Sequence, residues 1–260
     1  MTGLTSDTSG GTREGSGGLA FLLVVMKTIL KSVWSAIKGI NDPQTKKSEK
    51  FWDMVSGDFD NQAKAEEKSG EQTHLKIVEN TKKYLRENDN VLDYGCATGT
   101  VALEIVNNAK EVHGIDISSK MIEAANKKAA EKKAAEHNTG KLDFVQTTLF
   151  DDRLKRESFD VILAFNILHF SEDTEKVMQR IHELLKPGGL FLSATPCPGE
   201  KKSALGILLF LVTKIGIIPP MRFYKISELE DFVTRGNFQI VETECLVPNP
   251  PEYYIAARKI

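Results

Sequence analysis

The sequence has few of the residues that build disulfide frameworks and metal sites. Its 260 residues include 3 cysteines and 5 histidines. Cys96, Cys197 and Cys245 are far apart and form no C-x-x-C pair, and no histidines have H-E-x-x-H spacing. Disulfide-stapled and zinc-binding classes are therefore not indicated. We expect no metal, and the cysteine pattern favours a reducing, cytoplasmic compartment.

The sequence also lacks an excess of one charge. The 34 basic and 36 acidic residues give a formal net charge of −2. Proteins that bind nucleic acid usually carry a basic stripe or a strongly basic domain. Nucleic acid is therefore not expected as a partner. The apolar run at residues 19–26 is much shorter than the roughly 20 residues that a membrane-spanning helix needs.

The first 41 residues differ in composition from the rest. Residues 1–18 are rich in Gly, Ser and Thr, which predicts a flexible head. Residues 19–41 predict a basic amphipathic helix, with Lys27, Lys31 and Lys38 on one side and apolar residues on the other. Two roles stay open for this helix. It could lie in a membrane interface with its lysines toward anionic headgroups, or pack on its own domain or a partner.

Residues 42–260 alternate predicted strands and helices, as in a parallel α/β sheet. The run FDVILAF at 159–165 predicts a central strand covered on both faces. The last two β-rich runs, separated by PNPP, are too close for a helical crossover and must pair antiparallel. The expected helices are at about 45–55, 71–86, 99–109, 119–137, 173–185 and 226–235, and the expected strands before that hairpin are at 90–95, 111–116, 141–147, 159–165 and 189–195.

The first predicted strand of this sheet enters a small-residue turn in VLDYGCATGT, residues 91–100. In a doubly wound sheet a ligand binds here, because the following helix presents free N–H groups. Gly95 and Gly99 permit a sharp turn and close packing, but Ala97 stands where the dinucleotide fingerprint G-x-G-x-x-G has its second glycine. The turn therefore favours a ligand smaller than a pyrophosphate, such as an amino-acid end whose ammonium lies near Asp93.

Asp116 ends the second strand, about 20 residues beyond the turn. A carboxylate there accepts hydrogen bonds from both hydroxyls of a ribose. The alternative is an acidic residue at the start of a helix, before Ser118 and Ser119. Combined with the turn, the ribose interpretation is favoured. An amino-acid end and a ribose end together describe S-adenosylmethionine.

Four segments carry a family resemblance: VLDYGCATGTVALEI, VHGIDIS, FDVILAFNILHF and LLKPGGLFLSATP. In this order they make residues 50–260 resemble the class I S-adenosylmethionine-dependent methyltransferase family, in its small-molecule branch. The resemblance implies a methyltransferase with S-adenosylmethionine as cofactor. It also implies an α/β fold, a Rossmann-like doubly wound seven-stranded sheet with an antiparallel last strand and helices on both faces. The alternative of an NAD-dependent oxidoreductase is disfavoured, because the chain lacks the glycine fingerprint of that class.

The resemblance also implies positions for the cofactor-binding residues. The methionine part is expected at Asp93, Gly95, Cys96, Ala97 and Gly99, the ribose at Asp116, the adenine face at Ile117, and the sulfonium and acceptor near Asn166. Where the family often has an acidic residue at the adenine amino group, this chain has Thr148. Thr148 and Leu149 are therefore the expected adenine-edge residues. Cys96 is expected as a small apolar filler, because nothing near it in sequence activates a thiol.

The acceptor side of the site is less defined by the sequence. NILHF, residues 166–170, is not the N/D-P-P-Y/F signature of enzymes that methylate nucleobase amino groups. His169 is the candidate general base, with a packed structural histidine as the alternative. Residues 204–220 form an apolar insertion that predicts either a buried helix or a surface for a hydrophobic acceptor or a membrane.

We therefore expect methyl transfer to a small, lipid-like or quinone-like acceptor. Phe51, Phe59, Phe223 and Tyr224 are candidates to line or cover its site. Peripheral membrane contact is expected through residues 19–41 and 204–220. The alternatives are a protein methyltransferase and a non-catalytic S-adenosylmethionine-binding or assembly module of the same fold.

Overall fold

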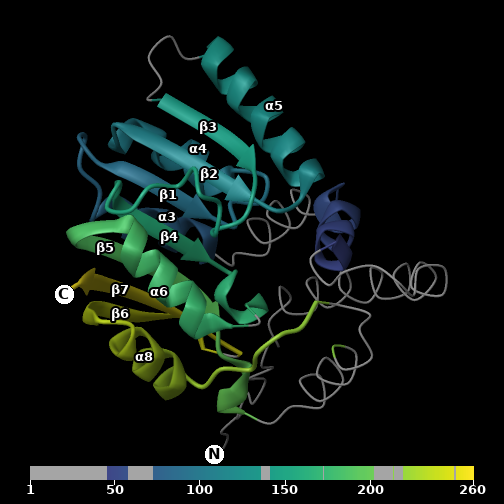
Figure 1. Cartoon of the computed structure of the whole chain (residues 1–260). Helices are drawn as coiled ribbons and strands as arrows, with labels where there is room; N and C mark the ends of the chain where they lie inside the picture. Colours follow the sequence, from purple (N-terminus) through teal and green to yellow (C-terminus); the bar gives the residue numbers. More distant parts are fainter. Residues whose placement is uncertain are drawn as a thin grey trace, which may run out of the picture.

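A seven-stranded sheet organises the part of the chain that the computed structural model describes, which is residues 46–57, 73–135, 141–171, 173–201, 213, 219–248 and 250–260 (Figure 1). The strand order is β3-β2-β1-β4-β5-β7-β6. The strands are β1 (Asn90–Tyr94), β2 (Glu111–Asp116), β3 (Lys141–Gln146), β4 (Phe159–Phe165), β5 (Leu185–Pro196), β6 (Phe238–Pro248) and β7 (Pro251–Lys259).

The topology of the sheet confirms the predicted fold class. β1 to β5 pair in parallel, and β7 lies antiparallel between β5 and β6. The expected hairpin of β6 and β7 is present, because the short link after Pro248 leaves no room for a crossover. β4 stands in the middle of the order, as its continuous apolar sequence predicted. The fold is Rossmann-like α/β.

Helices cover both faces of the sheet. They are a helix over residues 46–57, α3 (Thr73–Lys82), α4 (Thr100–Ile105), α5 (Ser119–Ala135), α6 (Thr174–Leu184), α8 (Ile226–Arg235) and the short 3-10 helices η1 (Val106–Asn108), η2 (Leu168–Phe170) and η3 (Pro198–Glu200). In Figure 1, α6 and α8 lie on the face turned toward the viewer, and α3 and α4 lie behind the sheet.

Some expected helix ends were wrong. α3 stops at Lys82, four residues early, because the Tyr84 N–H then donates to the Thr81 carbonyl in a tighter turn, at 3.0 Å. The helix expected over 99–109 is divided into α4 and η1, whose 3-10 turn begins at Val106. Local turn contacts of this kind are not visible in hydrophobic periodicity.

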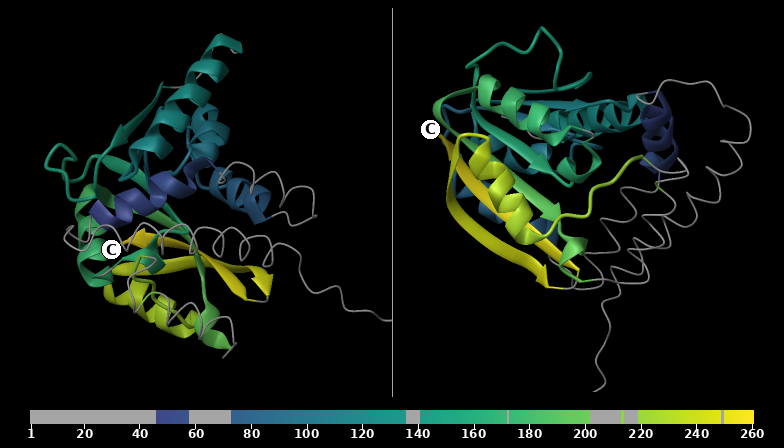
Figure 2. Two further views of the ribbon diagram at one scale, coloured as in Figure 1. Left: turned by 90° about the vertical axis from the view of Figure 1, so that its right-hand side faces the viewer. Right: turned by 60° about the horizontal axis from the view of Figure 1, so that its bottom comes forward.

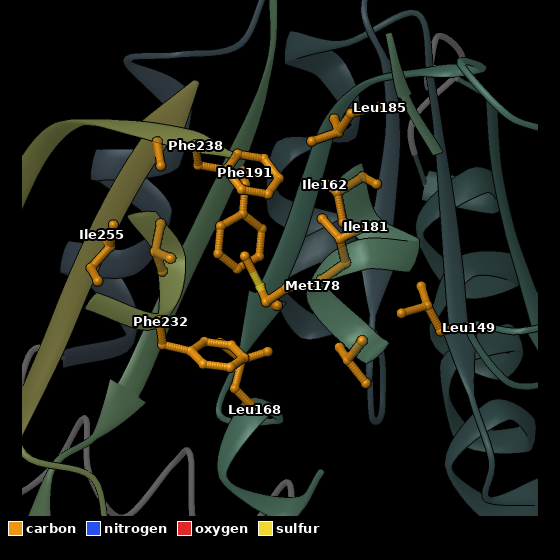
Figure 3. Close-up of a cluster of buried hydrophobic side chains, with 14 of the residues drawn as sticks. Leu149, Ile162, Leu168, Met178, Ile181, Leu185, Phe191, Phe232, Phe238 and Ile255 are labelled. Carbon is orange, nitrogen blue, oxygen red and sulfur yellow. The ribbon is translucent and has the colours of Figure 1, made fainter. Parts of the chain in front are cut away.

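The two faces of the sheet have separate hydrophobic cores. In Figure 3 the first core joins Phe191 of β5 to Met178 of α6, Phe232 of α8 and Phe238 of β6. The second core lies on the other face. Its buried residues include Ile77 and Val78 of α3, Ala102 and Ile105 of α4, Ile122 and Ala125 of α5, Val112 of β2 and Leu163 of β4. Burial on both faces fixes the sheet and leaves its carboxyl edge to carry function.

Several expectations fall outside the described residues. These are the head at 1–18, the amphipathic helix at 19–41, Phe59, and all of 204–220 except residues 213, 219 and 220. Within the described part of the chain, no helix is long and apolar enough to cross a membrane.

Candidate functional site

The turn between β1 and α4 has the tight backbone that its small residues predicted. Gly95, Ala97 and Gly99 have positive φ values of 74°, 48° and 75°. The N–H groups of Gly95 and Cys96 both donate to the Ile115 carbonyl of β2, at 2.9 and 3.1 Å. The turn is therefore fixed by its own backbone to the end of the neighbouring strand.

Glycine is required at both ends of this turn by φ and by packing. A Cβ at Gly99 would lie 2.4 Å from Phe144 Cζ, and one at Gly95 would lie 2.8 Å from Ile167 Cγ1. Ala97 adopts the left-handed region without being glycine, which costs about 1–2 kcal/mol. Strain of this size at a turn is typical of functional sites.

Asp116 joins the end of β2 to this turn. Its Oδ2 accepts the Ala97 N–H at 3.1 Å, and its Oδ1 accepts the Ser118 N–H at 2.8 Å. Burial raises the pKa of Asp116, while the hydrogen bonds from Ser118 and Ala97 oppose that rise. The turn and the carboxylate, about 20 residues apart in sequence, are thus brought into direct contact.

Asp93 lies buried at the end of β1, with 3% of its surface exposed. Burial, and then the charge of Asp116, raise the pKa of Asp93 to about 7. The pKa of the Cys96 thiol is also raised well above its usual value, first by burial and then by Asp93 and Asp116. A cation near Asp93 and Asp116 would favour their charged forms. The Cys96 thiol stays protonated and is therefore not a nucleophile.

The expected adenine-binding residues gather at the carboxyl ends of β2 and β3. The Thr147 N–H donates to the Asp116 carbonyl at 2.9 Å, which holds the two strand ends together. Ile117 is half-buried beside Asp116, Thr148 is exposed, and Leu149 is buried. Arg180 Nε of α6 donates to the Leu149 carbonyl at 3.2 Å. α6 therefore holds the loop after β3 in place.

The end of β4 presents Asn166 in an exposed position. Asn166 has a φ of 54°, and its N–H donates to the Ala194 carbonyl of β5 at 2.8 Å. Its Nδ2 donates to Glu252 Oε1 of β7 at 3.1 Å. β4 and β7 are thereby linked at the carboxyl edge. Glu252 has no sequence motif that marks it, because its partner lies 86 residues away in the chain.

His169 lies in η2 and is packed inside the protein. Only 6% of its surface is exposed, and its Nδ1 has no hydrogen-bond partner in the described part of the chain. Burial lowers the pKa of His169 to about 3. An imidazole with this pKa has little driving force to take a proton at neutral pH. The geometry therefore favours the packed alternative, and the base role stays a prediction.

The aromatic candidates for lining the acceptor site have different surroundings. Tyr224 is buried in the first core, where its hydroxyl shares a 2.8 Å hydrogen bond with Thr174. The structure gives Tyr224 a packing role, and its place as a lining residue stays a prediction. Phe223 is half-buried, and so is Phe51, whose ring lies 5.1 Å from that of Trp52.

The helix of residues 46–57 lies beyond the carboxyl ends of β2 and β3, beside the start of α5 (Figure 1). Its Asp53 accepts a 2.6 Å hydrogen bond from Ser118 Oγ. The Trp52 ring stacks edge-on against Phe170 of η2 at 4.8 Å. Seen from the right-hand side of Figure 1, this helix crosses in front of the sheet (Figure 2, left). The sequence gives no signal for Asp53, because its partners are 65–67 residues away.

Comparisons with known proteins bear on the fold and on the class of reaction. Residues 85–212 match a family model described as a methyltransferase domain. The chain is 25% identical over 165 residues to a ubiquinone biosynthesis O-methyltransferase of Rickettsia akari (strain Hartford), with 62% of each chain covered. It is 33% identical over 119 residues to sterol 4-C-methyltransferase strm-1 of Caenorhabditis elegans, covering 46% of this chain and 34% of that one. The chain thus spans about three-fifths of the length of the Rickettsia relative.

A solved structure shares the fold. Geranyl diphosphate C-methyltransferase of Streptomyces coelicolor A3(2), determined with Mg²⁺, geranyl diphosphate and S-adenosyl-L-homocysteine, superimposes with a TM-score of 0.65 and 12% identity, covering 84% of this chain and 99% of that one. The identity is low, so this likeness concerns the fold alone. The family model and the curated relatives add methyltransferases to this shared fold. These comparisons support a class I S-adenosylmethionine-dependent methyltransferase, with S-adenosylmethionine as the cofactor.

Proposed function

We propose that this chain transfers a methyl group from S-adenosylmethionine to a small hydrophobic acceptor by in-line displacement. The observation that carries the proposal is the contact between the turn and Asp116, through the Ala97 N–H at 3.1 Å. This contact fixes a backbone cradle and a carboxylate side by side at the carboxyl edge. Such an edge is where ligands bind in open α/β sheets.

The cofactor would be held by the chain's own groups in three parts. Its amino-acid end would lie at Gly95, Cys96, Ala97 and Gly99, with Asp93 near the ammonium. Asp116 would accept the ribose hydroxyls, Ile117 would cover the adenine face, and Thr148 and Leu149 would border the adenine edge. Asn166 would lie near the sulfonium. The carboxylates at the end of β1 and β2 match the hydroxyl donors and the positive charge of this ligand.

The bound sulfonium supplies an activated methyl group, so the chain's task is alignment and exclusion of water. Positioning alone can contribute about 7–11 kcal/mol of barrier reduction. Where the acceptor must lose a proton, Glu252 is better placed than His169, because it is only half-buried and it hydrogen-bonds Asn166 at the edge. His169 would instead support η2 from inside.

Hydrophobic character of the acceptor is supported by the chain's own sequence and by its relatives. Residues 204–220 are strongly apolar, and two relatives are named for ubiquinone biosynthesis and sterols. We further propose that the lysines of residues 19–41 bring the enzyme to an anionic membrane surface where such acceptors are found.

Product identification tests the activity. Purified chain is incubated with methyl-labelled S-adenosylmethionine and a lipid extract, and labelled products are separated. The expected result is one labelled apolar product that is absent with Asp116→Ala. Label found on protein would instead support protein methylation. Cofactor binding without transfer to lipid, metabolite or protein extracts would leave only a binding module.

Vesicle flotation tests the membrane proposal separately. We expect the intact chain to float with vesicles rich in phosphatidylglycerol and to stay at the bottom with phosphatidylcholine vesicles. The triple change of Lys27, Lys31 and Lys38 to Gln should abolish flotation, because each lysine near an anionic surface contributes about 1 kcal/mol. No flotation of the intact chain would overturn this proposal without affecting the methyl-transfer proposal.

A further inference from the structure

One helix bridges three strand ends at the candidate site. From the helix of residues 46–57, Glu49 Oε1 accepts Gln146 Nε2 of β3 at 3.0 Å. Trp52 packs on Phe170, which follows β4. Asp53 contacts Ser118, which follows β2. These contacts come from successive turns of a single short helix, so they form or break together.

Asp53 makes the densest set of these contacts. Its Oδ1 accepts Ser118 Oγ at 2.6 Å and the Lys120 N–H at 3.1 Å. Its Oδ2 lies 3.4 Å from Ser119 Oγ. Asp53 therefore acts as an N-terminal cap of α5 supplied from a distant helix, and its negative charge is favourable at that end of the 17-residue helix.

Ser118 couples this cap to the proposed ribose carboxylate. The Ser118 N–H donates to Asp116, while the Ser118 hydroxyl donates to Asp53 and accepts the Met121 N–H at 3.1 Å. Ser118 is fully buried. One residue thus holds Asp116 on one side and the bridging helix on the other.

We propose that Asp53 is a positioning residue that clamps the helix of residues 46–57 over the cofactor site and holds Asp116 in place through Ser118. This inference rests on the proposed function, because the clamped ligand is S-adenosylmethionine. Loss of the clamp frees the helix and removes a partner of Ser118. Release of bound cofactor then becomes faster, while the fold of the sheet is kept.

The test compares two aspartates that cap helices. Asp53→Ala removes the clamp, and Asp173→Ala removes the matched cap of α6, where Asp173 Oδ1 accepts the Lys176 N–H at 3.0 Å. Both variants lose an aspartate that accepts a helix N–H, so Asp173→Ala shows what cap loss alone does to cofactor dissociation. Only Asp53→Ala should speed S-adenosylmethionine dissociation, by about tenfold in stopped-flow measurements. Asp53→Glu should restore part of the slow rate, because it keeps the charge.

Tryptophan quenching provides a second readout. The chain has 2 tryptophans, so a Trp34→Phe background leaves Trp52 as the reporter. Asp53→Ala should make Trp52 more accessible to acrylamide than Asp173→Ala does. Equal dissociation rates and equal quenching in the two variants would overturn the clamp. A parent chain that binds no S-adenosylmethionine would overturn the proposed function instead, and the quenching comparison would still decide whether Asp53 holds the helix.

Discussion

Two stretches of the same carboxyl edge are built in different ways. At the ends of β1 and β2, the polar contacts go to backbone: Asp116 accepts the N–H groups of Ala97 and Ser118. At the end of β4 and the start of β7, a contact between two side chains, Asn166 and Glu252, is added to the backbone hydrogen bond of Asn166. The first stretch is fixed by the course of the chain, and the second depends on which side chains it carries.

Under the proposed function, the two stretches would hold two different ligands. A cradle made of backbone groups and positive-φ residues tolerates few substitutions, and it suits a ligand that stays the same. An edge made of side chains can be altered without disturbing the sheet, and it suits the acceptor, which differs among the named relatives. Each of the following substitutions is expected to affect one stretch and spare the other.

The largest effect is expected from Asp116→Ala. Hydrogen bonds to a charged group contribute about 1.5–3 kcal/mol each, so losing two to the ribose should weaken S-adenosylmethionine binding by at least about 100-fold in titration calorimetry. Asp116→Asn keeps the shape without the charge and should fall between this variant and the parent. Affinity of Asp116→Ala within about threefold of the parent would contradict the assigned cradle.

Glu252→Gln should act on the other stretch. For an acceptor that must lose a proton, we expect kcat to fall about 100-fold, because positioned bases contribute in this range. Cofactor affinity should stay the same. Glu244→Gln is the matched control, since Glu244 Oε2 also accepts an asparagine Nδ2, from Asn80 at 2.6 Å, but on α3 and away from Asn166. Equal loss of kcat in both variants would remove Glu252 from the mechanism.

The pH dependence of cofactor binding sharpens the comparison further. The fold raises the pKa of Asp93 from 3.8 to about 7, so protonated Asp93 stabilises the folded chain relative to the unfolded chain. This contribution to the free energy of unfolding is lost as pH rises from about 4 to 7, because the group then ionises. A cationic ligand favours the ionised form. Binding should therefore release a proton at pH 6, and affinity should rise by up to about tenfold per pH unit toward pH 7, then level off.

Calorimetry in buffers with different ionisation enthalpies measures that proton directly. The released proton should be absent at pH 8 and absent at every pH in Asp93→Asn. Proton release that persists in Asp93→Asn would assign the titration to another group, such as Asp116, whose pKa is also raised by burial.

The smallest effect is expected from Ala97→Gly. Glycine removes the strain of a φ of 48°, but it also adds freedom to the unfolded chain. The net free energy of unfolding should rise by about 0.5–1 kcal/mol in urea denaturation. A decrease would mean that the alanine methyl group packs favourably in the turn. Cofactor affinity should change little, because the Ala97 N–H that donates to Asp116 is kept.

Much of the fold and the tight turn after β1 followed from local sequence. The continuous apolar run of β4 predicted its central position, and the short PNPP link predicted the antiparallel hairpin. The turn residues Gly95 and Gly99 also behaved as expected, because φ preference is a local property. Helix ends such as Lys82 were missed, since a local change in backbone hydrogen bonding decides them.

Residues that act through long-range contacts could not be predicted in this way. Asp53 and Glu252 have no motif, and their partners are 65 and 86 residues distant in sequence. Tyr224 had a suggestive position in sequence but is buried in the core, which only packing of α8 and β5 reveals.

The sequence by itself determined the alternation of strands and helices, the bend after β1 and the presence of a carboxylate at the end of β2. Those features depend on backbone preferences and on which side chains are apolar. Only the tertiary structure decided which acidic groups lie close together, that His169 is enclosed, and that a distant helix caps α5. Burial and electrostatic coupling depend on three-dimensional distance, which the order of residues does not specify.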